Sequence, residues 1–596
     1  MIDLNQLRNA HNLARRDLLA ERAPQGHWAG ELSSSALSTA TAASALSLAA
    51  RHSEGTARQE ICRQLAARGL NWLAGHQNAD GGWGDTDKCL SNLSTTMLVR
   101  AAFHLAGPAE PHQQLLDRAV AYAEAQGGIS AIQGRYGKDK TFAVPILANC
   151  ALAGLVPWKS VAPLPFELAC VPFSMLNRIR LPVVSYAVPA LVAIGQVRYF
   201  HGKPRNPITW LVRRLAVGKS LRVLQQMQPA SGGFLEAVPL TSFVVMSLAA
   251  TGREDHIAVR RGIEFLASTI RSDGSWPIDT NLAMWNTSLA ISAMAAASGD
   301  VGALGCLDWL LSCQQHRVHP FTHAEPGGWG WSDASGAVPD ADDTSAALLA
   351  LAAFTKSSPQ GKAERIRAAA ADGVRWLLDL QNDDGGWPTF CRGWGTMPFD
   401  RSGTDLTAHA LRALEAWRPS IADRQPLAAR IEPAIDRGLE YLAHQQSGDG
   451  SWAPLWFGNQ HHPQEENPVY GTARVLLAYR DLGLIHTPPA EKAVGWLIAN
   501  QRQDGGWGGG GQTASGVEET AVAVEALVAR HDDPAISPPL EMGIRWLITA
   551  VESGRHREAT PIGFYFAKLW YYEKLYPLSF TVSALGQAVR CMIPPT

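Results

Sequence analysis

One short motif recurs along the chain and restricts the folds open to it: a glutamine, a polar spacer, Gly-Gly or Gly-Ser, and then an aromatic residue. From Phe234 onward these aromatics lie roughly 40 to 65 residues apart, a spacing typical of stacked supersecondary units. An amphipathic segment precedes each copy and an apolar, small-residue-rich segment follows it, so each interval holds one helix pair. The copies end at Trp83, Phe234, Trp276, Trp329, Trp387, Trp452 and Trp507.

The turn chemistry of this motif predicts an all-α fold. Glycine supplies the positive φ that a tight turn after a helix requires, and the aromatic ring can pack over the end of the preceding helix. The alternation of β-branched residues that signals strands is almost absent. We therefore expect a toroid or solenoid of helix pairs, in which the motif's own aromatics stabilise the fold without touching a ligand.

Composition excludes several classes of function. The 596 residues carry a formal net charge of -2, which provides no basic field for nucleic acid. Eight cysteines are scattered without C-x-x-C spacing, so we expect neither a metal site nor a disulfide framework. The first residues lack the apolar core of a signal peptide, and no stretch offers about 20 apolar residues without interruption, so we expect a cytoplasmic chain without a transmembrane helix.

The segment from about 181 to 222 combines apolar and basic residues. Its first part, LPVVSYAVPALVAIGQV, is apolar but interrupted by two prolines, and seven Arg and Lys residues follow by Arg222. This combination fits a segment that lies on an anionic membrane surface. A core helix followed by a solvated basic loop is the other interpretation of the same residues.

Three carboxylates stand directly before an apolar helix, at Asp340, Asp342 and Asp343 in VPDADDTSAA. Capping and the helix dipole would explain one or two of them. Three within four residues exceed what capping needs, and their mutual repulsion favours retention of a proton on one carboxyl. Facing a dry apolar cavity, that carboxyl would be a strong general acid.

A second polar pair occurs in the next repeat, where Asp405 and His409 are four residues apart and share a helix face. A protonated His409 could hydrogen-bond the acid cluster and orient the catalytic carboxyl. Without the Asp cluster, His409 would be better explained as a satisfied core histidine.

Aromatic residues outside the repeat turns suggest what the acid could act on. A carbocation in an apolar cavity is captured by lone pairs, whereas an aromatic face attracts it without forming a bond. Core packing explains any single ring, so the hypothesis depends on the rings together with the acid. The set comprises Tyr186, Trp285, Trp331, Phe390, Phe399, Trp456 and Tyr470.

The QxxDGGW-type repeats and the DADD motif together resemble the squalene–hopene cyclase family, whose members carry QW repeats and a DxDD motif. The resemblance spans the chain from GHWAGEL at Gly26 to YPLSFTVSALG at Tyr576. Oxidosqualene cyclases match less well, because their acid motif has a cysteine where this chain has Ala341. The resemblance therefore implies an alkene as the group that is protonated.

By this resemblance, Asp342 matches the proton donor, Asp340 and Asp343 its flanking carboxylates, and Asp405 and His409 the supporting pair. The aromatics named above match positions that line the family's cavity or hold the substrate's first isoprene unit. The C-terminal segment GFYFAKLWYYEKLYP is similar to one that contributes late-ring aromatics, which adds Phe564 and Phe566 to the candidates. No cofactor is implied.

The resemblance also implies an architecture and a setting. The fold would be two α/α barrels, the first inserted in the second: residues 1–30 and 281–596 would form the catalytic barrel and residues 31–280 the inserted one. Substrate would enter from the membrane through the 181–222 segment, which implies a peripheral, monotopic protein at the cytoplasmic face. A second copy of the chain, forming a homodimer, is a further candidate partner.

The implied activity is that of a class II terpene cyclase. It would protonate a terminal alkene of squalene or a squalene-like polyprene and direct cyclisation to a polycyclic hydrocarbon or alcohol. Two departures from the family leave the terminating step open. Where the family has a glutamate, this chain offers only Thr39 and Thr41, and Val238 and Pro239 replace a Gln-Pro pair. They also leave room for another linear terpenoid or a meroterpenoid precursor as substrate.

Two other functions remain as alternatives. A protein prenyltransferase β subunit also uses an α/α toroid, but it needs a zinc site of Asp, Cys and His, for which no convincing triplet appears. A non-catalytic repeat scaffold could bind a lipid on its inner face. The scaffold predicts that Asp342→Asn leaves function intact, whereas the cyclase predicts near-total loss.

Overall fold

The computed structural model describes residues 2–51, 55–107, 112–136, 141–179, 181, 183–297, 299, 301–355, 360–563 and 568–593. Its longer elements are α-helices, and its two named strands have two residues each, which confirms the predicted all-α class. The strands are β1 (Ser34–Ser35) and β2 (Trp276–Pro277). The helices before β2 are α1 (Leu4–Ala20), α2 (Ala36–Arg51), α3 (Ala57–Gly75), α4 (Leu93–Ala106), α5 (Gln113–Ala125), α6 (Gly128–Tyr136), α7 (Ala143–Leu152), α8 (Phe173–Arg178), α9 (Val183–His201), α10 (Pro207–Met227), α11 (Val238–Ala249) and α12 (Ile257–Thr269). Those after it are α13 (Ala283–Ala296), α14 (Leu307–Ser312), α15 (Ala341–Thr355), α16 (Gln360–Leu380), α17 (Thr404–Trp417), α18 (Ala428–Gln445), α19 (Pro468–Asp481), α20 (Pro488–Ala499), α21 (Val517–Leu527), α22 (Ser537–Glu552) and α23 (Tyr576–Met592).

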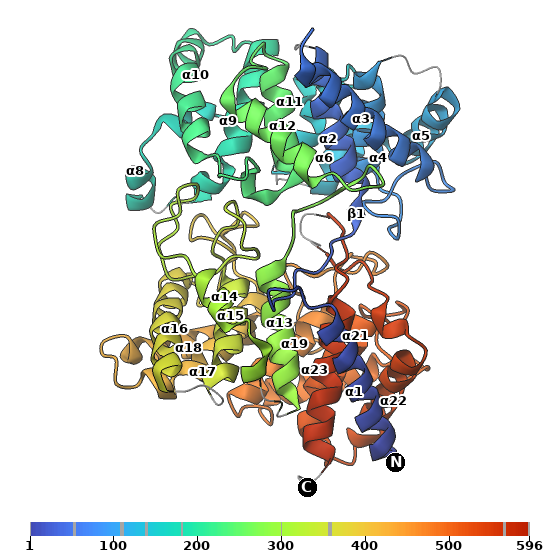
Figure 1. The fold of residues 1–596 in the computed structure, drawn as a ribbon, viewed down its shortest axis with the longest axis vertical. Helices are drawn as coiled ribbons and strands as arrows, with labels where there is room; N and C mark the ends of the chain where they lie inside the picture. Colours follow the sequence, from blue (N-terminus) through green and yellow to red (C-terminus); the bar gives the residue numbers. More distant parts are fainter. Residues whose placement is uncertain are drawn as a thin grey trace.

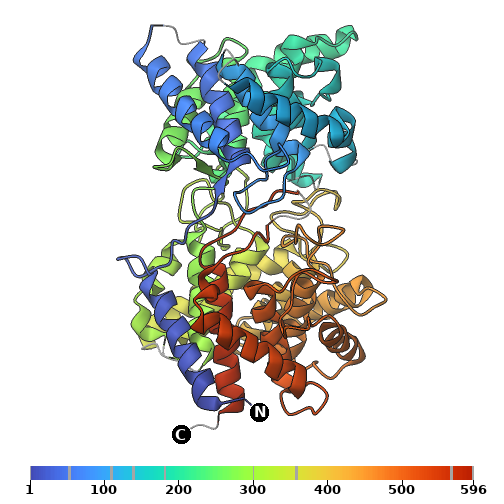
Figure 2. The same ribbon diagram turned by 90° about the vertical axis from the view of Figure 1, so that its right-hand side faces the viewer.

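The helices form two stacked lobes that meet through loops (Figures 1 and 2). In the lower lobe, helices α13, α15, α17, α19, α21 and α23 each pack on the next, and α23 packs on α13, so the ring closes. In the upper lobe, α2, α4, α7, α9 and α11 close a second ring in the same way. Outer helices cover both rings. The protein is therefore a double α/α barrel.

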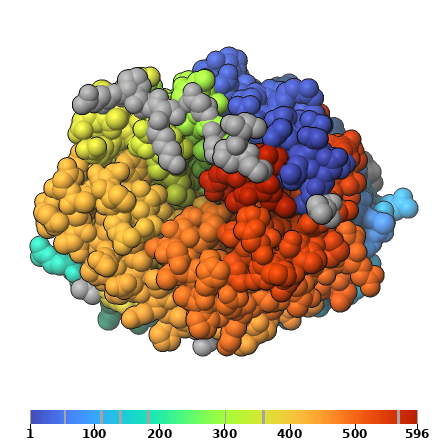
Figure 3. Space-filling model, turned by 90° about the horizontal axis from the view of Figure 1, so that it is seen from below, coloured from blue at the N-terminus to red at the C-terminus, as the bar shows by residue number. Residues whose placement is uncertain are grey.

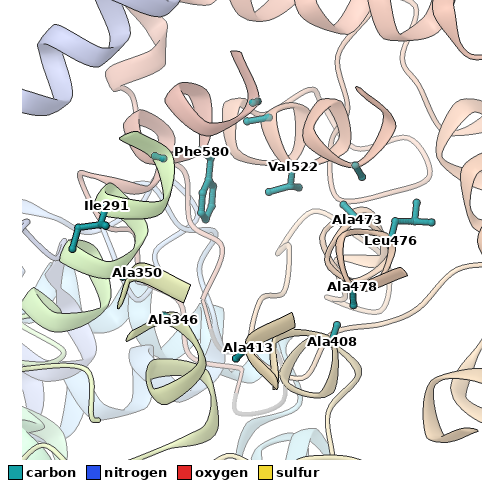
Figure 4. Close-up of a cluster of buried hydrophobic side chains, with 14 of the residues drawn as sticks. Ile291, Ala346, Ala350, Ala408, Ala413, Ala473, Leu476, Ala478, Val522 and Phe580 are labelled. Atoms are coloured by element: carbon teal, nitrogen blue, oxygen red, sulfur yellow. The ribbon is translucent and has the colours of Figure 1, made fainter. Parts of the chain in front are cut away.

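Small side chains let the inner helices of the lower ring approach one another. Figure 4 looks into this ring, with side chains from α13, α15, α17, α19, α21 and α23 drawn as sticks. Alanines such as Ala346, Ala408 and Ala473 are buried there with at most 2% of their surface exposed. Helices with alanine at the contact can pack closely, which is why the segments after each repeat motif are rich in small residues.

The repeat motif joins three helices at once, as the copy ending at Trp387 illustrates. The backbone N–H of Trp387 donates to the hydroxyl of Thr407 on the following inner helix (3.0 Å), and its indole Nε1 donates to the carbonyl of Leu377 at the end of the preceding outer helix (2.9 Å). The amide of Gln381 donates to the carbonyls of Gly385 (2.8 Å) and of Ala434 on the next outer helix (2.9 Å). The motif thus satisfies a backbone carbonyl at the end of the preceding helix that would otherwise lack a partner, and it joins the turn to both neighbouring helices.

Further copies repeat this geometry, and their rings are fully buried, as expected for residues that stabilise the fold. None of these rings is among the described residues that line the cavity presented below. The corresponding backbone bonds join Trp83 to Thr96, Phe234 to Thr241, Trp276 to Thr39, Trp329 to Thr344, Trp452 to Thr472 and Trp507 to Thr520.

Two bonds of this kind show how one barrel is inserted in the other. Trp28 follows the outer helix α1 but donates its N–H to Thr287 of α13, in the other part of the sequence (2.9 Å). Trp276 follows α12 and donates to Thr39 of α2 (3.0 Å). Helix α1 accordingly packs on α22 and α23, so both ends of the chain lie in the lower barrel (Figure 3). Strands β1 and β2, which pair antiparallel, are the two connections between the lobes.

In the described part of the chain, no helix combines the length and the apolar character needed to span a bilayer.

Candidate active site

A cavity of about 920 Å³ is lined by residues of both barrels. Most of its lining is aliphatic or aromatic, from Leu37 and Ile146 in the upper barrel to Trp285 and Tyr576 in the lower one. Carboxyl groups interrupt this apolar wall, and among the described lining residues none is lysine, arginine or histidine. The cavity can therefore hold a large, uncharged, mostly apolar molecule.

Asp342 lies in the first turn of α15 and lines the cavity. Its side chain is 22% exposed, and the side chain of His409 on α17 is 13% exposed. Nδ1 of His409 lies 2.5 Å from Oδ1 of Asp342. With Nδ1 protonated, the imidazole donates to Oδ1 and leaves the second carboxyl oxygen free for a substrate.

Asp340 and Asp343 line the same part of the cavity and are buried, with 4% and 5% of their surface exposed. Oδ1 of Asp340 accepts a hydrogen bond from the backbone N–H of Asp343 (2.8 Å), so the cap predicted for α15 is present. Burial raises the pKa of Asp340 to about 7, although hydrogen bonds from Asp343 lower it in part. Burial and the charge of Asp340 raise the pKa of Asp343 well above its ordinary value. The pair therefore holds a proton at neutral pH.

His409 differs from the sequence hypothesis in its charge. Burial lowers its pKa and outweighs the opposing effect of Asp342, so a neutral imidazole is favoured over the protonated form that we expected. The ring also meets Trp285 edge to face, with ring centroids 5.9 Å apart. Indole and carboxyl together fix the orientation of the imidazole.

Asp405, the other member of the predicted supporting pair, contacts a loop. Its two carboxyl oxygens accept hydrogen bonds from the backbone N–H groups of Leu455 (3.0 Å) and Trp456 (3.3 Å). Burial raises the pKa of Asp405 to about 6, and the charge of Asp342 adds to this rise. Asp405 thus positions the loop that carries Trp456, a role that sequence spacing alone did not suggest.

Phe390 is the centre of an aromatic cluster on the cavity wall. Its ring centroid lies 5.2 Å from that of Tyr186, 5.6 Å from Phe399, 6.0 Å from Trp331 and 6.4 Å from Trp456. All five residues line the cavity. The indole of Trp456 donates to Thr389 Oγ1 (2.9 Å), and the hydroxyl of Tyr186 donates to the carbonyl of Phe390 (3.2 Å). The polar ends of both rings are thereby held in the wall.

One predicted aromatic, Tyr470, lies elsewhere. Tyr470 is buried against Phe457, with ring centroids 4.5 Å apart, and is not among the described residues that line the cavity. Phe564 and Phe566 lie outside the described residues. Trp285, by contrast, lines the cavity beside His409.

Several lining residues were missed from the sequence. Phe457, Tyr571 and Tyr576 line the cavity, and the hydroxyl groups of the two tyrosines lie 3.0 Å apart. Their aromatic character was the available signal, because the C-terminal segment had been singled out without assigning these positions. Asp279 also lines the cavity, and no motif surrounds it. Within the described ranges, no group of three or more His, Cys, Asp or Glu side chains is arranged to bind a metal ion.

Comparison with known proteins places this geometry in a family. The model of the squalene-hopene cyclase C-terminal domain matches residues 281–590, that of the N-terminal domain matches residues 12–206, and a prenyltransferase alpha-alpha toroid domain model matches residues 171–317. A squalene–hopene cyclase of Bradyrhizobium diazoefficiens is 25% identical, with 86% of each chain covered.

Two other likenesses are informative. A terpene cyclase–glycosyl transferase fusion protein of Humicola fuscoatra is 26% identical over 94% of this chain, but the chain spans only 48% of that protein. The chain likewise spans only 42% of the enfumafungin synthase of Hormonema carpetanum. The solved structure of an ent-copalyl diphosphate synthase from Streptomyces platensis shares the fold, with a TM-score of 0.58, 19% identity and coverage of 98% of this chain and 99% of that one. Since the C-terminal family model alone matches more than half of the residues, the chain belongs to the squalene–hopene cyclase family.

Proposed function

We propose that this protein is a class II terpene cyclase, which protonates a terminal alkene of a linear polyprene with Asp342 and directs the cyclisation of the resulting cation. One observation carries the proposal. The carboxyl of Asp342, held by His409 and flanked by the buried pair Asp340 and Asp343, lines a largely apolar cavity with aromatic walls.

The first step transfers the carboxyl proton of Asp342 to a carbon of the terminal double bond. The O–H bond breaks, the π electrons form a new C–H bond, and the adjacent carbon becomes a tertiary cation. His409 stabilises the carboxylate that remains, because its Nδ1 lies 2.5 Å from Oδ1. Enclosure among apolar side chains excludes the water that would otherwise capture the cation.

The next steps add further double bonds of the polyprene to the cation. Rings such as Phe390, Trp331 and Trp456 face the cavity, and their π-faces stabilise positive charge by up to about 2 kcal/mol each when water is excluded. The cavity walls hold the chain in a folded conformation before the proton moves, which lowers the entropic part of the barrier. Loss of a proton, or capture of water, ends the sequence and returns a neutral product.

Incubation of the purified chain with squalene in detergent, followed by mass spectrometry of the extract, tests this proposal. A cyclic C30 hydrocarbon or alcohol that is absent with Asp342→Asn is the expected result. Conversion that persists in this variant would favour an acid other than Asp342. If no linear polyprene of any length were converted by the unaltered protein, the lipid-binding scaffold would replace the cyclase.

A membrane surface is the second part of the proposal, and exposed apolar residues of the upper barrel support it. Ile208 and Leu215 on α10 are each 73% exposed, and Met175 on α8 is 56% exposed. Arginines and lysines lie on the same segments, as at Arg178 and Lys219. Apolar side chains beside cations fit the interface of an anionic bilayer, through which a greasy substrate would arrive.

Sedimentation with vesicles of phosphatidylcholine and phosphatidylglycerol tests this surface. The double variant Ile208→Glu, Leu215→Glu should remain in the supernatant while the unaltered chain sediments. Ile61→Glu is the matched control, because Ile61 is 49% exposed on α3, away from this surface. Equal sedimentation of all three proteins would contradict the assignment.

A further inference from the structure

One carboxyl group that lines the cavity lies outside the acid cluster. Asp340, Asp342 and Asp343 stand together at the start of α15, whereas Asp279 belongs to the loop between β2 and α13. Among the described lining residues these are the four carboxylic acids. The proton transfer described above makes no use of Asp279, so its presence in an apolar wall requires another explanation.

The backbone holds Asp279 beside the start of α11. Residues Ala237 and Asp279 form an antiparallel bridge, and the N–H of Val238 donates to the carbonyl of Ile278 (3.1 Å). The N–H of Thr280 donates to Oδ1 of Asp279 (2.7 Å). Asp279 is therefore fixed at the junction of the two barrels.

Glu236 stabilises this junction through hydrogen bonds of its carboxylate. Its carboxylate accepts hydrogen bonds from the N–H of Gly336 (2.6 Å) and from the hydroxyls of Ser231 (2.6 Å) and Thr280 (3.2 Å). Leu235 and Glu236 both adopt positive φ, at 54° and 53°, a conformation that is unfavourable for non-glycine residues. Backbone strain that the surrounding bonds maintain is typical of a preorganised ligand site.

The chemistry of the wall limits what Asp279 can bind. Burial raises the pKa of its carboxyl well above the ordinary value, and the charge of Glu236 adds to the rise, so the neutral acid is favoured at neutral pH. A neutral carboxyl both donates and accepts hydrogen bonds. A hydrocarbon offers it no partner. A diphosphate would need cations, and the described lining residues include no lysine or arginine.

Resting on the proposed function, we propose that Asp279 is a substrate-binding residue that recognises a hydroxyl group on the polyprene, so that the preferred substrate is a polyprenol or polyprenyl phenol rather than a hydrocarbon or a diphosphate. The hydroxyl would lie against the junction wall while the terminal alkene lies at Asp342. Apolar rings between the two would hold the carbon chain.

The test compares geranylgeraniol with its deoxy analogue, in which hydrogen replaces the hydroxyl group, and with geranylgeranyl diphosphate. We expect kcat/KM for the alcohol to exceed that for the deoxy analogue by roughly tenfold or more, because the deoxy analogue cannot form the hydrogen bond with the carboxyl of Asp279. The diphosphate should be the poorest substrate. In Asp279→Leu the ratio of kcat/KM for the alcohol to kcat/KM for the deoxy analogue should fall to about one.

Asp279→Asn keeps the size and hydrogen-bonding capacity of the side chain, so it should retain part of the preference and shows that the loop still folds. Equal kcat/KM for alcohol and deoxy analogue in the unaltered chain would overturn the inference and leave the proposed cyclase intact. Two other results would also overturn the inference and leave the cyclase intact: Asp279→Leu could lower kcat/KM for the alcohol and the deoxy analogue equally, or the diphosphate could be the best substrate. Absence of cyclic product from all three compounds and from squalene would instead overturn the proposed function, and this inference with it.

Discussion

Replacement of Asp340 by asparagine should stabilise the protein at neutral pH while it impairs the acid cluster. Asp340 is 4% exposed, and burial raises its pKa from 3.8 to about 7. A group whose pKa is higher in the folded state binds its proton more tightly there. Its ionisation therefore destabilises the fold progressively as pH rises from about 4 to about 7.

The magnitude follows from the size of the shift. Three pKa units at about 1.4 kcal/mol each give about 4 kcal/mol as the upper limit of this destabilisation above pH 7. Asparagine cannot ionise, and its side-chain oxygen can still accept the hydrogen bond from the N–H of Asp343 (2.8 Å). The variant should therefore be more stable than the unaltered chain at pH 8, by about 2 to 4 kcal/mol, and similar to it at pH 4.

Denaturant unfolding at several pH values between 4 and 8.5 measures this difference. Asp504→Asn is the matched control with the opposite sign. Burial alone would raise the pKa of Asp504, but hydrogen bonds from Ser515 and Gly506 outweigh this effect and lower the pKa. That variant should be less stable than the unaltered chain by a nearly constant amount across this pH range, because the pKa of Asp504 lies below its ordinary value of 3.8 and the difference is lost only as the pH falls through it. A constant difference between Asp340→Asn and the unaltered chain across the pH range would refute the reasoning.

Two further predictions concern packing and orientation. Gly438→Ala should lower stability by about 1 to 3 kcal/mol, because the new methyl group would lie 2.8 Å from Leu411 and 3.0 Å from Trp387. Gly495→Ala should instead raise stability by about 0.5 to 1 kcal/mol, because its new methyl group would have no neighbour within 4 Å. Thermal unfolding checks both, and changes of the same sign would be inconsistent with the packing described. His409→Phe should lower kcat by roughly 100-fold with little change in KM, since the imidazole orients Asp342 without touching substrate; a rise in KM alone would contradict this positioning role.

Much of the fold could be predicted because local sequence patterns determine it. The Gln-to-aromatic spacing encodes a turn whose hydrogen bonds run to neighbouring helices, so each copy signals one helix pair. The DADD sequence likewise placed Asp342 at a helix start. Its pairing with His409 follows from the packing of their helices, α15 and α17, which are neighbours in the inner ring.

Features that depend on burial or distant backbone could not be obtained in this way. The neutral charge of His409 is a consequence of burial, which the sequence does not reveal. Asp405 bonds to backbone N–H groups 50 and 51 residues later, and those positions carry no side-chain signal. Asp279 reaches the cavity only because Ala237 and Asp279 are paired across the junction. Tyr470 packs against Phe457 and is not among the described lining residues, a placement that no local pattern signals.

Turnover of a linear polyprene in deuterium oxide tests the central claim most directly. If Asp342 delivers a solvent-exchangeable proton to the alkene, each cyclic product molecule should carry one deuterium on the carbon that was protonated, located by mass spectrometry and NMR, and Asp342→Asn should form no cyclic product. Cyclic product without deuterium, or labelled product formed at an undiminished rate by Asp342→Asn, would contradict the account.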